Sequence, residues 1–101
     1  VDDLAAAVVH LGSTYDSPQH LNIGSGEDLT IKELAELVAE LAGFKVEIAW
    51  DSTKPDGTPR KVLDVSKAKS LGWAPKISLR DGIASTIAWY KDASAKGVAR
   101  R

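Results

Sequence analysis

The chain contains no cysteine, and this absence excludes several classes of protein. Disulfide-stapled folds, thiolate catalysis and zinc sites with sulfur ligands all require cysteine. An excess of positive charge is also missing, since 13 Lys and Arg stand against 14 Asp and Glu, for a formal net charge of −1. A nucleic-acid-binding module that relies on charge is normally basic, so no nucleic-acid partner is expected.

Long apolar runs are missing as well. None is long enough to span a bilayer, and no basic segment precedes an apolar one as in a secretory signal. We therefore expect no membrane partner and a cytoplasmic location. The remaining composition, 44% hydrophobic and 27% charged over 101 residues, is that of a globular domain. Because the first residue is Val1 rather than Met, we expect the chain to be a fragment of a longer protein.

Apolar residues recur at helical spacing in four stretches. The predicted helices cover residues 2–13, 31–42, 67–71 and 79–92. The first is expected to bury a stripe of Leu4, Val8 and Leu11. The second has the clearest ends, because Thr30 and Glu33 match a capping box and Gly43 suits the position after a helix. Ser66 and Ser78 are the predicted caps of the last two helices.

Short strand candidates lie between these helices, at residues 20–23, 45–50 and 62–65. In residues 45–50, apolar and other residues alternate, as in a half-buried strand. Its last residue, Trp50, is expected in the core rather than as a stacking surface. The sequence thus predicts a small α/β domain, similar to the α+β class, with a few short strands and about four helices. So few strands would make a poor sheet without helices or further strands to pack against.

Three motifs that could carry chemistry have simpler readings. The run Gly24–Asp28 looks like the start of a dinucleotide fingerprint, but Leu29 replaces its third glycine and its acidic residues would repel a pyrophosphate, so a plain turn is favoured. The two histidines, His10 and His20, are expected at the surface or its boundary rather than on a metal. Neither tyrosine begins the Tyr-x-x-x-Lys pair of hydride-transferring dehydrogenases.

The segment 51–61 is the most informative part of the sequence. It is long for a loop in so small a domain, and such loops are often functional. Two prolines stiffen it on either side of Gly57. Its basic residues Lys54, Arg60 and Lys61 suit a diphosphate, and Asp56 can accept hydrogen bonds from a sugar hydroxyl or a base N–H. The simpler alternative is a solvated turn whose charges are balanced by Asp51, Asp56 and Asp64.

A family resemblance rests on six runs of the sequence taken together: Val1–Ala5, Asn22–Asp28, Thr30–Ala35, Asp64–Ala68, Leu71–Pro75 and Ser78–Ile83. Together they resemble the C-terminal region of the extended short-chain dehydrogenases that act on nucleotide sugars, in the NAD-dependent epimerase/dehydratase family. The resemblance extends over residues 1–92. Within the family, the run Lys54–Lys61 is similar to the loop of epimerase-reductases that act on GDP-4-keto-6-deoxymannose.

The resemblance implies the organisation of a longer enzyme. Members have an N-terminal Rossmann domain, which binds NADP and carries the catalytic Ser, Tyr and Lys, and a smaller C-terminal domain that binds the nucleotide sugar. They are commonly homodimers. Residues 1–92 would be the nucleotide-sugar-binding domain, and residues 93–101 a frayed tail. The chain alone would bind no cofactor, contain no catalytic residue and be inactive.

Carried over residue by residue, Asp56 would contact the GDP moiety of the substrate, and Lys61, Arg60 and Lys54 would contact its phosphates. Two alternatives stay open. The chain could belong to an epimerase or dehydratase that acts on a UDP- or dTDP-sugar, or it could be a non-enzymatic interaction module that recruits a partner through exposed apolar surface.

Overall fold

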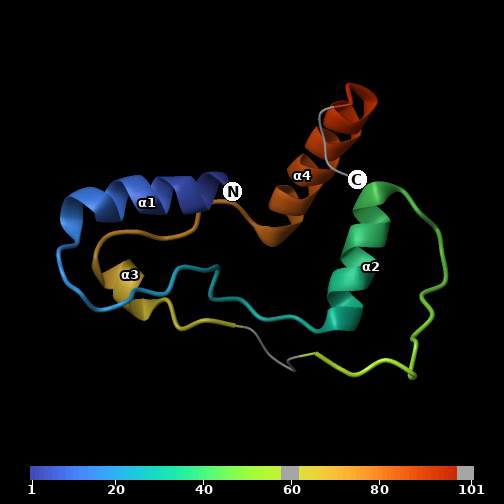
Figure 1. Ribbon diagram of the computed structural model, residues 1–101, viewed down its shortest axis with the longest axis horizontal. Coiled ribbons are helices and arrows are strands. Elements are labelled where there is room, and N and C mark those ends of the chain that lie inside the picture. Colours follow the sequence, from blue (N-terminus) through green and yellow to red (C-terminus); the bar gives the residue numbers. More distant parts are fainter. Residues whose placement is uncertain (58–61, 98–101) are drawn as a thin grey trace. The chain divides into compact units, whose positions relative to one another are not determined.

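The computed structural model describes residues 1–57 and 62–97 and is built from four helices. In chain order these are α1 (Asp2–Thr14), α2 (Ile31–Ala42), α3 (Ser66–Ser70) and α4 (Leu79–Ala95), as Figure 1 shows. The chain divides into two compact units. Unit 1 comprises Val1–Asp28 and Thr58–Ser78, and unit 2 comprises Leu29–Gly57 and Leu79–Arg101.

The predicted α/β class is wrong, because the described residues form helices and no strand. Residues 20–23, 45–50 and 62–65 contain no regular secondary structure in place of the expected strands. Alternation of side chains determines which of them share a face, but a strand also needs a neighbouring backbone to hydrogen-bond with. In the described residues no such neighbour is paired with these segments, and Trp50, expected in the core, is 58% exposed.

Helix α1 buries a different face from the one its apolar spacing predicted. Ala7 and Leu11 are buried as the core-facing pair, whereas Leu4 and Val8 of the predicted stripe are 55% and 65% exposed. Because the sequence from Leu4 to Val9 is apolar throughout, periodicity could not select one face. Long-range contacts determine which face of α1 is buried.

Two side chains on the buried side of α1 make these long-range contacts. The carboxylate of Asp3 accepts backbone N–H groups of Lys76, at 3.0 and 3.2 Å, and of Ile77, at 2.8 Å. About two turns further on, the ring of His10 hydrogen-bonds through Nε2 to the carbonyl oxygen of Leu71 at 2.8 Å. These bonds hold α1 against residues 71–77 and so determine which side of the helix is covered.

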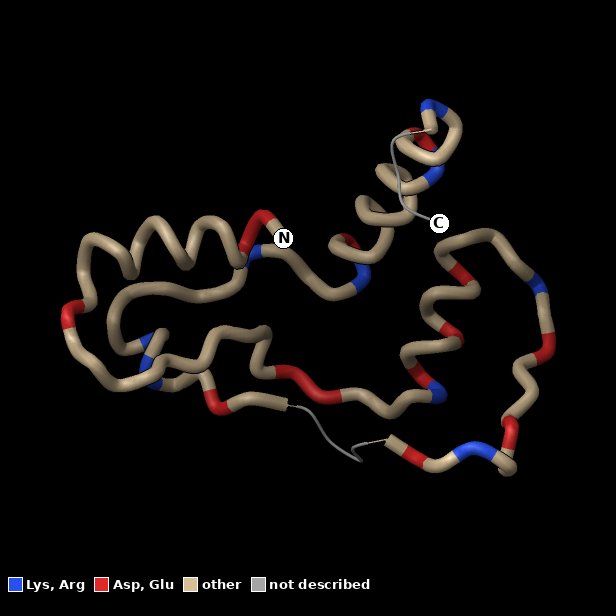
Figure 2. Tube along the Cα trace, viewed as in Figure 1, with Lys and Arg blue, Asp and Glu red and all other residues tan. Residues whose placement is uncertain are grey.

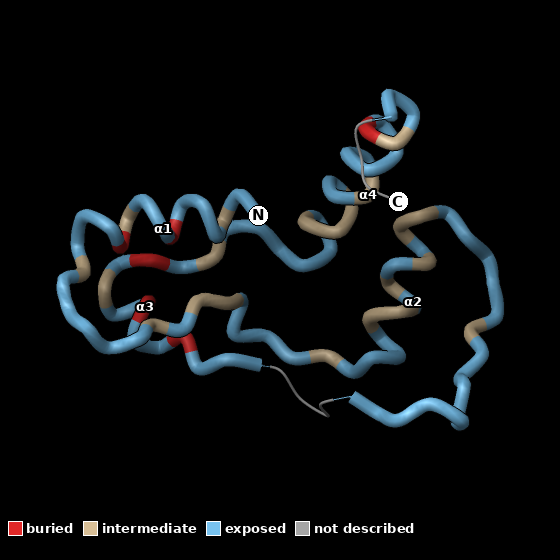
Figure 3. Tube along the Cα trace, viewed as in Figure 1, coloured by how far each residue is buried: buried red, intermediate tan, exposed pale blue. Residues whose placement is uncertain are grey.

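The core of unit 1 is small and contains a single large side chain. It consists of Ala7, Leu11, Ala68 and Trp73, with Tyr15, Leu21, Ile23 and Leu71 packed around it. Figure 3 shows this burial concentrated on α1, α3 and the segments beside them. Ala7 of α1 and Ala68 of α3 are both fully buried in this cluster. Trp73, 7% exposed, supplies most of the apolar area.

Unit 2 is built from the packing of α2 on α4. The ends of α2 are those that the sequence predicts: the Thr30 hydroxyl accepts the Glu33 N–H at 3.1 Å, and Gly43 is left-handed with φ 80°. Arg80 of α4 makes two hydrogen bonds to the Glu40 carboxylate of α2, at 2.7 and 3.3 Å. This ion pair lowers the pKa of Glu40, but both side chains are more than half exposed, so it stabilises the unit only weakly.

Three of the predicted helices have different ends in the structure. Helix α1 extends one residue beyond the predicted end at residue 13. Helix α4 extends three residues beyond the predicted end at residue 92, and its one buried residue, Ala93, lies in this extension. Helix α3 begins at Ser66 itself, so the predicted cap at Ser66 is wrong. Helix α3 is followed by Gly72 at φ 90°, which confirms the predicted stop.

Among the described residues no helix is long and apolar enough to cross a membrane.

Candidate functional site

The first half of the 51–61 loop is a turn organised by Asp51. The Asp51 carboxylate accepts the Thr53 N–H at 3.0 Å and also the Thr53 hydroxyl, while the Lys54 N–H lies 3.4 Å from the Asp51 carbonyl oxygen. The hydroxyl and the N–H of Thr53 hold the pKa of Asp51 below its ordinary value. Asp51 is therefore occupied in shaping the turn rather than in balancing the charge of a loop lysine.

This turn should respond to acid at an unusually low pH. Because the folded pKa of Asp51 is lowered, the turn is fully stabilised above the ordinary aspartate pKa of about 3.9 and is lost as pH falls through the lower folded value. We expect the Thr53 amide resonance to titrate at a lower pH than in an unstructured peptide of residues 49–55. Equal midpoints in the chain and the peptide would contradict the turn.

The predicted ligand residues Lys54 and Asp56 lie just after this turn, exposed and in the same unit. Figure 2 shows that charges of both signs follow one another along residues 51–57. In the described part of the chain, no ion pair or side-chain hydrogen bond engages either residue. The other two predicted ligand residues, Arg60 and Lys61, lie outside the described residues.

Residues 62–66, which we call the loop exit, are held more firmly. The Asp64 carboxylate accepts the Ser66 N–H at 3.0 Å and the Ser66 hydroxyl at 2.7 Å, and these bonds lower the pKa of Asp64. Between them, Val65 is 4% exposed. Charge balance alone does not indicate this role of Asp64. The repeated spacing Asp-x-Thr at 51–53 and Asp-x-Ser at 64–66 would have revealed it, since such residues form side-chain turns.

The run Gly24–Asp28 lies against Val65 of the loop exit. A Cβ atom on Gly24 would lie 3.6 Å from Val65 Cγ1, and one on Gly26, whose φ is +74°, would lie 3.2 Å from Val65 Cγ2. Ser25 accepts the Glu27 N–H at 3.2 Å. The space that a fingerprint would leave open for phosphate is here filled by the Val65 side chain.

The N-terminus of α2 is equally unsuited to a dinucleotide phosphate. Thr30 occupies the Glu33 N–H and donates its own hydroxyl to the Glu33 carboxylate at 3.1 Å. An anion would meet a capped helix end and a negative charge. The residues of this chain therefore do not fit an NADP phosphate site at either place.

The histidines occupy the positions the sequence predicts, His10 at the boundary of the core and His20 exposed. Within residues 1–57 and 62–97, no group of three potential ligand side chains could hold a metal ion. His10 instead has the structural contact to Leu71 described above.

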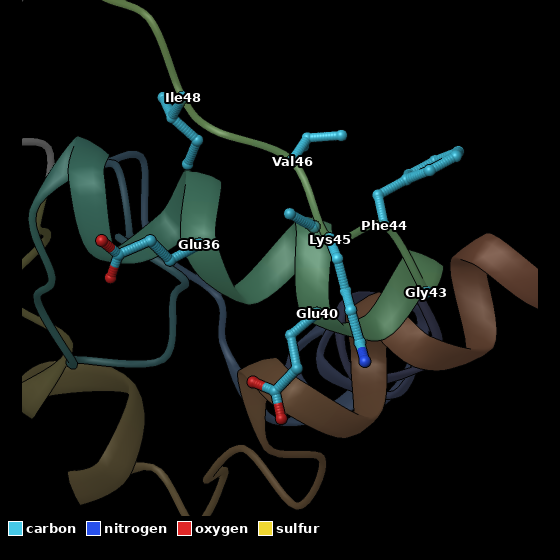
Figure 4. A pocket seen from close by; sticks show the side chains of 8 residues that line it. Glu36, Glu40, Gly43, Phe44, Lys45, Val46 and Ile48 are labelled. Atoms are coloured by element: carbon cyan, nitrogen blue, oxygen red, sulfur yellow. The ribbon is translucent and has the colours of Figure 1, made fainter.

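One shallow groove is present in unit 2, between α2 and the extended segment after it. Its volume is roughly 590 Å³, and Figure 4 shows side chains from both segments around it. The lining residues are Glu36, Ala39, Glu40, Gly43, Phe44, Lys45, Val46 and Ile48. Neither Lys54 nor Asp56 lines it, so the groove and the predicted ligand residues are separate features.

Comparison with known proteins identifies relatives for most of the chain. No family model matches it. A putative GDP-L-fucose synthase 2 of Arabidopsis thaliana is 61% identical over 90 residues, which are 89% of this chain and 27% of the relative. The GDP-L-fucose synthase of Escherichia coli is 46% identical over 99 residues, covering 89% of this chain and 31% of the relative. The chain thus spans less than a third of the length of the curated relatives it matches.

Solved structures agree with the sequence relatives. The GDP-mannoheptose C4 reductase MlghC of Campylobacter jejuni, solved with NADP bound, superposes with a TM-score of 0.76 at 38% identity, over 89% of this chain and 29% of that one. DdhaC superposes with a TM-score of 0.71 at 36% identity, over 97% and 29%. These findings confirm that the chain resembles a segment of the GDP-L-fucose synthases, within the extended short-chain dehydrogenases.

Proposed function

We propose that this chain supplies the nucleotide-sugar-binding part of a longer NADP-dependent enzyme that converts GDP-4-keto-6-deoxymannose to GDP-L-fucose. The observation that carries the proposal is the similarity to GDP-L-fucose synthases, 46–61% over about nine-tenths of the chain. Such an enzyme epimerises the keto sugar at two carbons and then reduces the ketone. In this proposal residues 1–92 form the nucleotide-sugar-binding domain, and homodimerisation would be a property of the longer protein.

Asp56 is the residue we propose to recognise the nucleotide. It is exposed and has no side-chain partner among the described residues, so binding a ligand would break no existing contact. An ionised carboxylate accepts two hydrogen bonds side by side. Guanine offers two adjacent N–H donors on one edge, whereas uracil and thymine offer one. A carboxylate at this position therefore favours GDP over UDP or dTDP.

The basic residues of the same loop suit the diphosphate. Lys54 lies two positions before Asp56 and is also exposed, so its ammonium group can move toward a phosphate as a point charge. Arg60 and Lys61 follow in the sequence and are proposed for the same role. Lysine and arginine on one exposed loop bind phosphate weakly by themselves, so tight binding would need contacts from the rest of the longer protein.

The chemistry of the reaction is proposed to lie outside this chain. Of the two places that could have held a dinucleotide, the run Gly24–Asp28 is filled by Val65 and the N-terminus of α2 is capped by Thr30. NADP, which is bound in the related C4 reductase, would bind to another part of the longer protein. In this proposal the residues of the chain bind and orient the GDP-sugar, and none acts as an acid or base.

The test is a titration of the ¹⁵N-labelled chain with GDP up to millimolar concentration, with UDP and dTDP as controls. We expect amide shifts concentrated in residues 51–66, with GDP stronger than either control. Equal shifts with all three nucleotides would favour a UDP- or dTDP-sugar enzyme. Absence of shifts with every nucleotide would count against a nucleotide site in this chain and favour an interaction module.

A further inference from the structure

Residues 44–48 of unit 2, which we call the edge segment, have backbone groups without partners. The Phe44 N–H bonds the carbonyl oxygen of Ala39 at 2.9 Å, but none of residues 45–48 makes a backbone hydrogen bond with another described residue. Two apolar side chains of the segment, Phe44 and Val46, are 64% and 62% exposed. A non-helical backbone with unpaired donors and acceptors and exposed apolar side chains is suited to pair with another backbone.

The edge segment lies beside α2, across the shallow groove of unit 2. Val46 and Ile48 of the segment line this groove together with Glu36 and Ala39 of the helix, and Figure 4 shows the segment and the helix on either side of it. Two paired strands are marginally stable in water by themselves and gain stability when they pack on a helix. The helix α2 of each copy would therefore support a pairing of two edge segments.

The order of residues makes the edge segment complementary to itself in an antiparallel pair. A register centred on Val46 places each Lys45 opposite the Glu47 of the other copy. The same register places each Phe44 opposite the Ile48 of the other copy. Successive side chains point to opposite faces of a strand, so the apolar pairs share one face and the two Lys–Glu pairs share the other. Neither Lys45 nor Glu47 has an ion-pair partner among the described residues.

The neighbouring symmetric registers are less favourable. A register centred on Lys45 or on Glu47 would bring two like charges directly opposite each other, which destabilises a strand pair. A register centred on Ile48 would place Lys45 opposite Asp51, whose carboxylate is already occupied by the turn that follows the segment. The charges therefore favour the register centred on Val46.

We propose that the edge segment is a self-association surface, through which two copies of this chain pair antiparallel over residues 44–48 in the register centred on Val46. The contact is symmetric, because the same patch serves on both copies, and it closes as a dimer. A strand from the rest of the longer protein is the competing occupant. The match of Lys45 to Glu47 within five residues favours a second copy. The pairing uses no residue of the 51–61 loop, so it does not depend on the proposed nucleotide site.

Reversal of the two charges tests the pairing and its register. Lys45→Glu leaves only acidic charges in the edge segment, and Glu47→Lys leaves only basic ones, so each variant by itself would set like charges opposite each other. We expect each to raise the dissociation constant of the dimer roughly tenfold or more. An equimolar mixture of the two variants restores opposite charges in every pair and should associate at least as well as the unsubstituted chain. The double variant Lys45→Glu/Glu47→Lys should dimerise as the unsubstituted chain does.

Lys32→Glu is the matched control, because it makes the same change of net charge at an exposed residue of unit 2 outside the edge segment. Its dimer should have the unsubstituted dissociation constant. Sedimentation equilibrium up to millimolar concentration measures association, and far-ultraviolet circular dichroism checks that each variant keeps its helices.

The proposal is supported if the unsubstituted chain dimerises, each edge variant by itself weakens the dimer and their mixture recovers it. It is overturned if the unsubstituted chain stays monomeric at millimolar concentration, which would leave the edge segment to a strand of the longer protein. It is also overturned if the edge variants associate no differently from Lys32→Glu, or if the mixture associates no better than either variant by itself.

Discussion

Replacing Trp73 by alanine is expected to destabilise unit 1 by about 3–5 kcal/mol. Trp73 is 7% exposed and is the one large side chain in a cluster whose other buried members are Ala7, Leu11 and Ala68. Removing the indole leaves a cavity that its neighbours, among them Tyr15, Leu21, Ile23 and Leu71, can fill only in part. A loss of this size is a large part of the stability of an ordinary domain.

Urea unfolding followed by far-ultraviolet circular dichroism measures this loss, and Trp50→Ala is its matched control. The control removes the same side chain from a residue that is 58% exposed, so its effect should stay within about 0.5 kcal/mol. Equal costs for the two substitutions would contradict the assignment of Trp73 to the core. If only Trp50→Ala lowered the free energy of unfolding by a large amount, Trp50 rather than Trp73 would be the core residue.

Replacing Asp56 by asparagine is expected to produce the largest functional effect. The substitution keeps the size of the side chain but places an amide NH₂ where guanine presents donors. Hydrogen bonds to a charged group contribute about 1.5–3 kcal/mol, so the affinity for GDP should fall roughly tenfold to a hundredfold. No side-chain contact of Asp56 within the described residues is lost, so the melting temperature should not change.

Glu47→Gln is the matched control for Asp56→Asn. Glu47 is an exposed carboxylate of the same unit, and its substitution removes the same charge outside the loop. Heteronuclear NMR titration with GDP should give the unsubstituted affinity for Glu47→Gln and a weakened one for Asp56→Asn. If both variants weaken binding equally, net charge rather than a contact at Asp56 determines affinity. If neither does, Asp56 is not a ligand residue.

Part of the site could be read from the sequence because its signals are local. The prolines, the glycine and the charges of residues 51–61 indicated an exposed loop suited to a nucleotide, and the structure places Lys54 and Asp56 there, exposed and without side-chain partners among the described residues. Their binding roles stay predictions. The turn at Asp51 and the one at Asp64 are also local, with acceptor and donor two residues apart. Charge balance alone does not distinguish these two aspartates from Asp56, whereas their spacing to Thr53 and Ser66 does.

The sequence by itself determined the features whose partners lie within one helical turn. The ends of α2 are of this kind: Thr30 is three residues from Glu33, and the N–H of Gly43 bonds the carbonyl oxygens of Ala39 and Glu40. Such contacts form wherever the local chain is helical, and a pattern of residue types is enough to predict them.

Only the tertiary structure decided which face of α1 is buried, which tryptophan forms the core and whether the extended segments become strands. The bond from Lys76 to Asp3 joins residues 73 positions apart, and that between His10 and Leu71 joins residues 61 apart. Every residue from Leu4 to Val9 is apolar, so burial of either face of α1 fits the local pattern. Spacing along the chain shows which residues can share one face of a helix. The free energy that favours burial of one face over another comes from contacts with residues far away in the sequence.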